Sequence, residues 1–244
     1  MNAAASTTAV LLAAGSSNRM GNQIDDKILA PLAGATAFAH VLRAFRDSRV
    51  ARHFVVAYRD AAQRKSLETI ARTELTNTLP VIWVEGGQHR QDSVWNALQH
   101  LDKATTHVFV HDCARPLIRP DQLKLLLDIV CADGAVCLAR KVTDTIKRAP
   151  RDRPRLRHMR LEDVPRDRLW AMETPQAFDR HLIVDAYHLL QETGEQVTDD
   201  AAVVEAFGHP VSLVSNHSPN LKLTLPADLD IIEALLVRDA RQES

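Results

Sequence analysis

The sequence has no long apolar run, because no stretch approaches the roughly 20 residues that cross a membrane. Residues 1–6 also lack the basic and apolar segments of a signal peptide. Cysteine is scarce: Cys113, Cys131 and Cys137 have no metal-ligand spacing, and their apolar neighbours predict buried, reduced thiols. These absences argue against any membrane partner and predict a cytoplasmic protein.

An excess of charge of either sign is missing as well. The 244 residues carry 30 Lys and Arg against 31 Asp and Glu, a net charge of −1, which argues against a general nucleic-acid binder. The sequence shows no repeat, low-complexity tract or interdomain linker. We therefore expect a single domain over residues 1–244, with ample length for a large core.

Residues 8–14 form an apolar run long enough for a buried strand, which ends in small residues and Gly15. Small residues let backbone N–H groups approach an anion, and Arg19 and Lys27 add positive charge nearby. The pattern predicts a phosphate-binding loop at the carboxyl end of a first strand, where α/β proteins usually bind ligands.

The standard nucleotide-binding spacings are absent from this loop. Ser17 stands where G-x-G-x-x-G needs its second glycine, and Gly15 and Gly21 are one residue too far apart for G-x-x-x-x-G-K-[ST]. From spacing alone, an ordinary strand-to-helix turn with two solvated cations is an equal alternative.

Strand and helix patterns alternate along the rest of the chain. Strands are predicted at residues 53–58, 80–84, 107–110, 135–139 and 211–215, and helices at residues 60–72, 121–130 and 181–191, with others starting near Thr36, Val94 and Pro226. In the helix at 181–191, the side chains expected to be buried are Leu182, Ala186 and Leu189. This alternation predicts a mostly parallel sheet covered by helices on both faces.

The strand at residues 80–84 leads into Gly86 and Gly87. A Gly-Gly turn chosen for its backbone conformation is the plain interpretation. Because the pair lies at the carboxyl end of a strand beside the first loop, it also suits a base pocket, in which the glycine backbone and Ser93 read a pyrimidine edge.

Asp112 follows the strand at residues 107–110. A carboxylate at the end of a central strand is well placed to hold Mg²⁺ against nucleotide phosphates. One carboxylate can suffice, because the phosphates supply most of the other oxygen ligands. The alternative is a cap or turn residue, which is the commoner role of an aspartate after a strand.

Residues 140–168 hold eleven Lys and Arg against five Asp and Glu, with three prolines interspersed. A nucleic-acid binder would use such a stretch, but this one has no aromatic residue to stack a base. Residues 142–147 alternate apolar and polar side chains, and residues 159–161 could pair with them across the tip. The stretch predicts an inserted β-arm at residues 141–167.

Two polar segments lie near the carboxyl terminus. Thr198 is a good N-cap for a helix whose first turn is acidic. Asn220, Lys222 and Thr224 alternate on one face of an expected strand, where a lysine is usually just solvated.

Six ordered motifs, spread from Ala9 to Leu236, resemble those of the 2-C-methyl-D-erythritol 4-phosphate cytidylyltransferase family, within the sugar-nucleotide pyrophosphorylase and cytidylyltransferase superfamily. They include A-A-G-x-x-x-R-M with Lys27 further on, G-G-x-x-R-x-x-S-V, V-H-D-x-A-R-P, T-P-Q-x-F and N-x-K-x-T. The resemblance implies a Rossmann-like three-layer αβα fold with a mostly parallel twisted sheet. It also implies a protruding β-arm that crosses to the second subunit of a homodimer.

The activity that the resemblance implies is transfer of the cytidylyl group of CTP to methylerythritol phosphate, with release of pyrophosphate, in the non-mevalonate isoprenoid pathway. The nucleophile is then a phosphate oxygen that is already ionised, so no general base is needed. This agrees with the absence of any Ser–His–Asp, Cys–His or paired-carboxylate signature in the sequence.

The resemblance also implies roles for individual residues. Arg19, Lys27 and Lys222 would be the catalytic cations, and Asp112 would hold Mg²⁺. CTP would be bound by Ala13, Ala14, Gly15, Ser16, Gly87, Gln88, Arg90 and Ser93. The acceptor phosphate would be bound by Arg115, Thr174 and Thr198, and across the dimer by Thr145 and Arg166.

Two departures from the family pattern bear on the loop. Ser17 replaces a common glycine, and Asp25 and Asp26 place two anions beside Lys27, so either change could weaken triphosphate binding. The alternatives in function are a cytidylyltransferase for an alditol phosphate such as ribitol 5-phosphate, a non-catalytic nucleotide-binding homologue, and an RNA-binding role of the arm.

Overall fold

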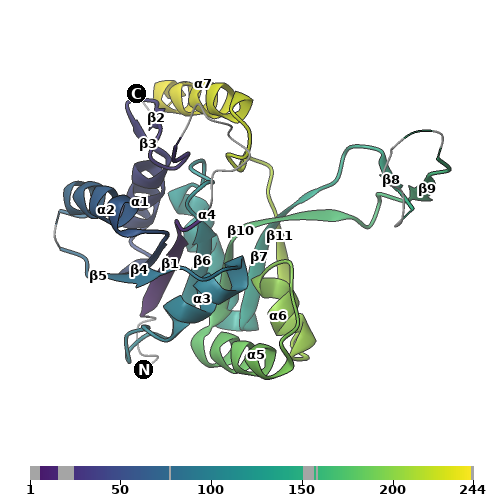
Figure 1. The fold of residues 1–244 in the computed structure, drawn as a ribbon, viewed down its shortest axis with the longest axis horizontal. Coiled ribbons are helices and arrows are strands. Elements are labelled where there is room, and N and C mark those ends of the chain that lie inside the picture. The colour runs from purple at the N-terminus through teal and green to yellow at the C-terminus, as the bar shows by residue number, and fades with distance from the viewer. Residues whose placement is uncertain (1–5, 16–24, 77, 151–156, 158, 243–244) are drawn as a thin grey trace.

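The computed structural model describes residues 6–15, 25–76, 78–150, 157 and 159–242. At its centre is a seven-stranded sheet in the order β11-β7-β10-β6-β1-β4-β5 (Figure 1). The strands are β1 (Thr7–Leu12), β4 (Ala51–Tyr58), β5 (Val81–Glu85), β6 (His107–Asp112), β7 (Ala135–Lys141), β10 (Trp170–Asp179) and β11 (Ser212–Ser215). Neighbouring strands pair in parallel except β10, which is antiparallel to both β6 and β7. The expected mostly parallel sheet is confirmed.

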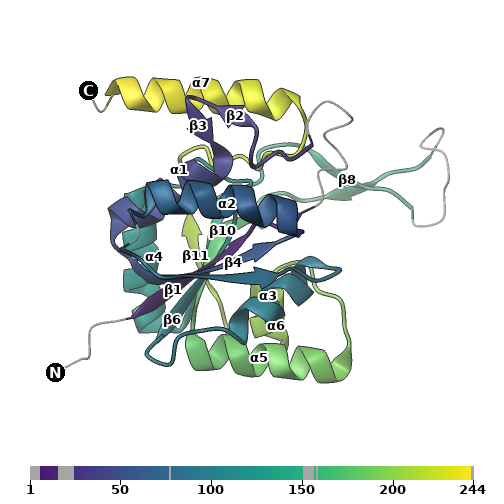
Figure 2. The same ribbon diagram turned by 60° about the vertical axis from the view of Figure 1, so that its left-hand side comes forward.

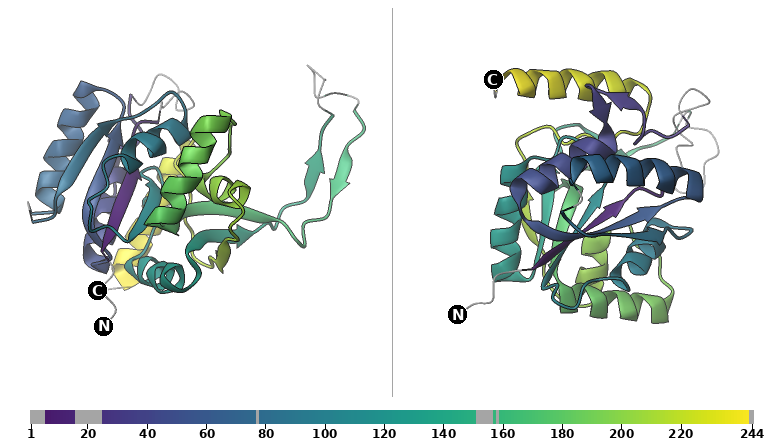
Figure 3. Two further views of the ribbon diagram at one scale, coloured as in Figure 1. Left: turned by 90° about the horizontal axis from the view of Figure 1, so that it is seen from below. Right: turned by 90° about the vertical axis from the view of Figure 1, so that its left-hand side faces the viewer.

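Helices cover both faces of this sheet (Figures 2 and 3). On one face pack α1 (Ala37–Ser48), α2 (Ala61–Glu74) and α4 (Pro120–Asp133), and on the other α3 (Arg90–Leu98), α5 (Arg180–Thr193) and α6 (Asp200–Ala206). The last helix, α7 (Ala227–Gln242), lies over a small hairpin of β2 (Pro31–Leu32) and β3 (Ala35–Thr36). Among the described helices, none has the length and apolar character needed to cross a bilayer. The three-layer fold is confirmed.

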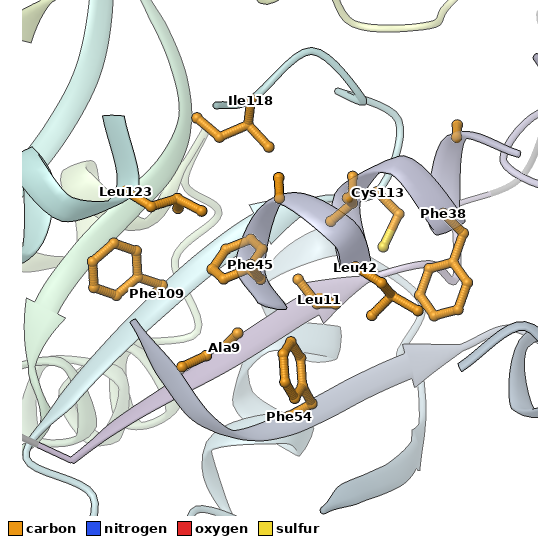
Figure 4. Packing of buried hydrophobic residues seen from close by; sticks show 14 of the residues in the cluster. Ala9, Leu11, Phe38, Leu42, Phe45, Phe54, Phe109, Cys113, Ile118 and Leu123 are labelled. Carbon is orange, nitrogen blue, oxygen red and sulfur yellow. The ribbon is translucent and has the colours of Figure 1, made fainter. Parts of the chain in front are cut away.

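The core beneath α1 shows why this helix forms where the sequence predicts it. The hydroxyl of Thr36 accepts a hydrogen bond from the backbone N–H of Ala39 and caps the helix. The apolar residues on one face of the helix are buried. Among them, Phe45 packs edge-on against Phe54 and Phe109, at ring-centroid distances of 6.3 and 6.4 Å (Figure 4). This packing fixes α1 against β4 and β6 and so holds the central strands in place.

β7 and β10 continue beyond the sheet into a protruding arm, where β8 (Ile146–Arg148) pairs with β9 (Glu162–Val164) (Figure 1). The expected pairing with residues 159–161 is wrong, because Ile146 lies opposite Val164. Ion pairs of Lys147 with Asp163 and of Arg148 with Glu162 join the two strands and favour this register.

The buried face of α5 also differs from the expectation. Leu189 is 40% exposed and Leu182 is only half-buried. Apolar residues lie on two adjoining faces of the helix. The face that packs inward is the one that carries Tyr187, whose ring stacks parallel to that of Trp95. The buried side chains are therefore Ile183, Ala186, Tyr187 and Leu190.

Three smaller expectations are wrong. Thr198 does not cap α6, because the carboxylate of Asp199 accepts the N–H of Ala202, and an aspartate caps a helix as well as a threonine does. Residues 220–224 form no strand and do not join the sheet. Cys131 is exposed, because it lies on the solvent side of α4.

Candidate functional site

A cavity of about 460 Å³ opens where the chain order of the sheet reverses. From β1 the chain moves to β4 and β5 on one side and then returns to β6 on the other side. The cavity lies at the carboxyl ends of these strands, the usual ligand-binding place in such sheets. Its lining includes Ala13, Ala14, Gly15, Lys27, Arg59, Gly87, Gln88, Arg90, Ser93, Asp112 and Lys222.

A second cavity of about 230 Å³ adjoins the first and shares Arg90, Asp112 and Lys222 with it. Three residues predicted to hold an acceptor phosphate line it, namely Arg115, Thr174 and Thr198. The structure therefore brings most predicted site residues into two adjoining cavities. Their roles stay predictions, and Ser16, Ser17 and Arg19 lie outside the described residues.

The other two predicted residues, Thr145 and Arg166, lie on the arm and line neither of these two cavities. Both are exposed, and the guanidinium of Arg166 donates to the carbonyl oxygen of Thr143 across the arm. Figure 3 shows the arm extending away from the body of the chain.

Space, rather than backbone conformation, explains the glycine pair. A Cβ on Gly86 would lie 2.4 Å from the Cβ of Ala14, and one on Gly87 would lie 2.1 Å from the Cβ of Asp92. Neither glycine has a positive φ. Gly86 therefore lets the loop after β5 pack directly against Ala14 in the loop after β1, and Gly87 leaves room for Asp92 in α3. Gly15 and Gly87, one from each loop, line the cavity.

Ser93 stabilises this turn through hydrogen bonds of its hydroxyl group. Its hydroxyl accepts from the N–H of Gly87 at 3.0 Å and faces the carbonyl oxygen of His89 at 3.3 Å. The carboxylate of Asp92 accepts the N–H of His89 at 2.8 Å. These bonds give Ser93 a role in shaping the Gly87–Arg90 wall of the cavity.

Asp112 is the centre of charge in the site. It is 7% exposed and lies between Arg90, 3.3 Å from Oδ1, and the Nζ of Lys222, 2.6 Å from Oδ2. Burial alone would raise the pKa of Asp112, but the positive charges of Arg90 and Lys222 outweigh it and hold that pKa far below its usual range. Asp112 is therefore a carboxylate at any physiological pH.

Arg90 is connected to Asp200 and, through it, to Tyr187, two buried residues that the sequence analysis did not single out. Arg90 also donates to Asp200 at 2.8 Å, and the hydroxyl of Tyr187 donates to the other oxygen of Asp200 at 2.6 Å. Asp200 is 0% exposed. In the sequence Asp200 reads only as a first-turn acid of α6, and nothing there indicates that an arginine 110 positions away pairs with it.

Lys222 is held in position by the hydrogen bonds of its neighbours in residues 220–224. Leu223 donates its N–H to the carbonyl oxygen of Ala114 at 2.7 Å, and Asn220 donates its amide to the carbonyl oxygen of Thr174 at 2.9 Å. Arg115 in turn donates to the carbonyl oxygen of Asn220 at 2.7 Å. Side-chain and loop bonds thus replace the sheet ladder expected here.

His111 lies directly under the site with 0% exposure. Its Nε2 is 3.1 Å from the carbonyl oxygen of Arg115, and its Nδ1 is 3.1 Å from the hydroxyl of Thr174, which also accepts the N–H of Asp112. The network assigns the proton to Nε2, because the carbonyl can only accept. Burial lowers the pKa of His111 to about 4.

We expect this histidine to make the stability of the fold sensitive to mild acid. In the unfolded state a histidine has a pKa of about 6.5, so below that pH the unfolded state binds a proton that the folded state does not bind. We expect His111 to cost roughly 1.4 kcal/mol of unfolding free energy per pH unit between the two pKa values. Urea unfolding of wild type and His111→Gln between pH 7.5 and 4.5 checks this, and parallel pH profiles would contradict it.

Comparison with known proteins gives one consistent result. A family model described as 2-C-methyl-D-erythritol 4-phosphate cytidylyltransferase matches residues 7–238. A protein of that name from Pelotomaculum thermopropionicum is 37% identical over 228 residues, which cover 93% of each chain.

Solved structures agree with this match. The crystal structure of the 2-C-methyl-D-erythritol 4-phosphate cytidylyltransferase from Thermus thermophilus is 30% identical, with a TM-score of 0.73 over 93% of this chain and 97% of that chain. The 4-diphosphocytidyl-2C-methyl-D-erythritol synthase from Anaerococcus prevotii has a TM-score of 0.80, covering 95% and 98%. Its 24% identity supports the fold alone.

Proposed function

Because the chain belongs to the 2-C-methyl-D-erythritol 4-phosphate cytidylyltransferase family, we propose that it converts CTP and 2-C-methyl-D-erythritol 4-phosphate into 4-diphosphocytidyl-2-C-methyl-D-erythritol and pyrophosphate. This is a step of the non-mevalonate isoprenoid pathway. The observation that carries the proposal is the convergence of Lys27, Asp112 and Lys222, from three distant segments, on one cavity.

In the proposed reaction, a phosphate oxygen of the acceptor attacks the α-phosphorus of CTP. The bond from that phosphorus to the oxygen bridging the β-phosphate breaks, and pyrophosphate leaves with the electron pair. The attacking oxygen is already ionised, so the difficulty is to bring two anions together and to stabilise the developing charge.

The chain supplies cations for each part of this task. Lys27 lines the first cavity beside Gly15, where the triphosphate would lie, and Arg115 lines the second, where the acceptor phosphate would lie. Lys222 lines both. Fixed positive groups of this kind stabilise a phosphoryl-transfer transition state without reorganising.

We propose Mg²⁺ as the cofactor, held by Asp112 and the phosphates of CTP. Asp112 fits as a ligand because it is ionised and lines the triphosphate cavity. Within the described part of the chain there is no group of three or more His, Cys, Asp or Glu that could hold a metal alone, so the phosphates of CTP and water would provide the other oxygen ligands. When bound, the ion neutralises charge on the phosphate oxygens.

The test is pyrophosphate release from CTP and Mg²⁺, with methylerythritol phosphate and ribitol 5-phosphate assayed side by side. Turnover with methylerythritol phosphate alone supports the proposal. Turnover with ribitol phosphate alone keeps the chemistry but changes the substrate. Folded protein that binds CTP but releases no pyrophosphate with either acceptor would overturn the proposed enzyme.

We also propose that the chain is one domain with the arm of residues 141–167 inserted, and that it acts as a homodimer. Thr145 and Arg166 are exposed on the protruding arm and line neither of the two adjoining cavities. In a dimer they would complete the acceptor site of the partner. We place the enzyme in the cytoplasm, because Cys113, Cys131 and Cys137 are free thiols, as is usual in a reducing compartment.

Mixing two inactive variants tests the dimer. In a heterodimer of Arg166→Ala and Lys27→Ala subunits, one of the two sites has both residues intact. After subunit exchange we expect about one quarter of wild-type activity, since half the dimers are mixed and each has one good site. No recovery, in a mixture shown by sedimentation to contain dimers, would contradict a role of Arg166 across the interface.

A further inference from the structure

A short turn at Asp26 presents Lys27 to the triphosphate cavity. Oδ1 of Asp26 accepts the N–H of Ile28 at 3.1 Å, and its carbonyl oxygen accepts the N–H groups of Leu29 and Ala30 at 3.1 and 3.0 Å. Asp26 thus begins the turn that contains Lys27. The carboxylate that the sequence sets beside a catalytic cation is used to build the backbone there.

The second oxygen of Asp26 is held from α2. Its Oδ2 lies 2.6 Å from the Nε2 of Gln63 and 3.3 Å from a guanidinium nitrogen of Arg59. Gln63 is 3% exposed and is itself fixed by its N–H, which donates to Asp60 at 2.8 Å. A buried amide therefore donates to a carboxylate, which is a stronger bond than one between neutral groups.

The same amide reaches the end of β1. Nε2 of Gln63 also donates to the carbonyl oxygen of Ala13 at 3.0 Å, and its Oε1 accepts the N–H of Arg59 at 2.6 Å. The amide's amino group and its oxygen are both engaged. One side chain thus joins the ends of β1 and β4 to the turn at Asp26, and only glutamine provides two donors and an acceptor with this reach.

We infer that Gln63 is a positioning residue for the triphosphate site. It sets the distance between the backbone of Ala13–Gly15 on one side of the cavity and Lys27 on the other. Ala13 and Asp26, to which its amide donates, lie 50 and 37 residues away in the sequence, and Gln63 does not line the cavity itself. The inference rests on the proposed function, because it assigns the triphosphate to this cavity.

The variant Gln63→Glu tests the inference with almost no change of shape. The new carboxylate cannot donate a hydrogen bond to Ala13 or Asp26, and its charge repels that of Asp26. The turn at Asp26 should therefore shift, and Lys27 should no longer be held at the cavity. We expect Mg²⁺–CTP to bind at least about tenfold more weakly by calorimetry at pH 8. Gln191→Glu, on an exposed part of α5 on the opposite face of the sheet, is the matched control and should bind CTP like the wild type.

Two further readouts separate positioning from a general loss of structure. The charged groups next to the new carboxyl are Asp26, Arg59 and Asp60. Asp26 in turn interacts with the thiol of Cys113, whose pKa is raised by burial, Asp112 and Asp26. With Asp26 as the near neighbour, the new carboxyl takes up a proton as the pH falls, and it can then donate again. The affinity deficit against wild type should therefore shrink between pH 8 and pH 6.

The double variant Gln63→Glu with Asp26→Asn reverses donor and acceptor, and it should recover part of the lost affinity at pH 8. Wild-type CTP affinity in Gln63→Glu, or a deficit that neither low pH nor the double variant reduces, would overturn the inference. Failure of the proposed function is distinguishable from this result, because it would appear as a wild-type protein that binds CTP but does not release pyrophosphate.

Discussion

Lys27→Ala is expected to lower kcat by about a hundredfold to a thousandfold while the fold stays intact. Lys27 lines the cavity together with Gly15 and Asp112, at the place where the α-phosphate and the departing pyrophosphate would gain charge. A fixed ammonium there stabilises the transition state more than the ground state, so kcat falls and not only the affinity for CTP.

Steady-state kinetics with CTP varied at saturating acceptor measures this effect. Lys65→Ala removes the same charge from an exposed position on α2 and should have near-normal kinetics. Arg19→Ala is expected to behave like Lys27→Ala, although Arg19 lies outside the described residues. Near-normal turnover in both site variants would disprove the assignment of the triphosphate to this loop.

Arg90→Met should be the most destabilising change at the site, by about 3–5 kcal/mol of unfolding free energy. Arg90 is 27% exposed at its side chain, but its partner Asp200 is fully buried. Removing the guanidinium leaves a carboxylate without its cation in the core and also takes one partner from Asp112. Tyr187→Phe removes only a hydrogen bond to Asp200 and should cost about 1–3 kcal/mol.

Urea unfolding at neutral pH measures both losses. Arg238→Met is the matched control, because Arg238 is 50% exposed and its partner Asp239 is also paired with Arg119. It should change the stability by well under about 1 kcal/mol. Arg90→Met with Asp200→Asn should regain part of the loss, since no uncompensated charge is then buried. A small effect of Arg90→Met alone would mean that Asp200 does not need this cation.

The sequence was sufficient to place the strand ends and the residues that follow them. Gly15, Gly87 and Asp112 come within three residues of the ends of apolar runs, and parallel strands bring their carboxyl ends to one edge. Their convergence on one cavity is therefore a consequence of the strand pattern. The family resemblance added Lys222, which lies in a segment without the sheet pairing that periodicity predicts.

What the sequence could not show depends on pairing between distant segments. β10 was not predicted because Pro175 interrupts it, and the register of its pairing with β7 shifts between Met172 and Gln176. Gln63 and Asp200 look like ordinary residues in the first turns of helices. Only the packed fold shows that one joins two loops and that the other holds Arg90.

The wall between the two cavities consists of charged side chains, Arg90, Asp112 and Lys222. An anion bound in one cavity would interact with the same cations that attract an anion into the other cavity. If the two proposed substrates bind in these cavities, their affinities are thermodynamically linked, and by reciprocity each changes the other's dissociation constant by the same factor. Lys222, which lines both cavities, would then interact with both phosphates, so binding at one site would change the affinity at the other.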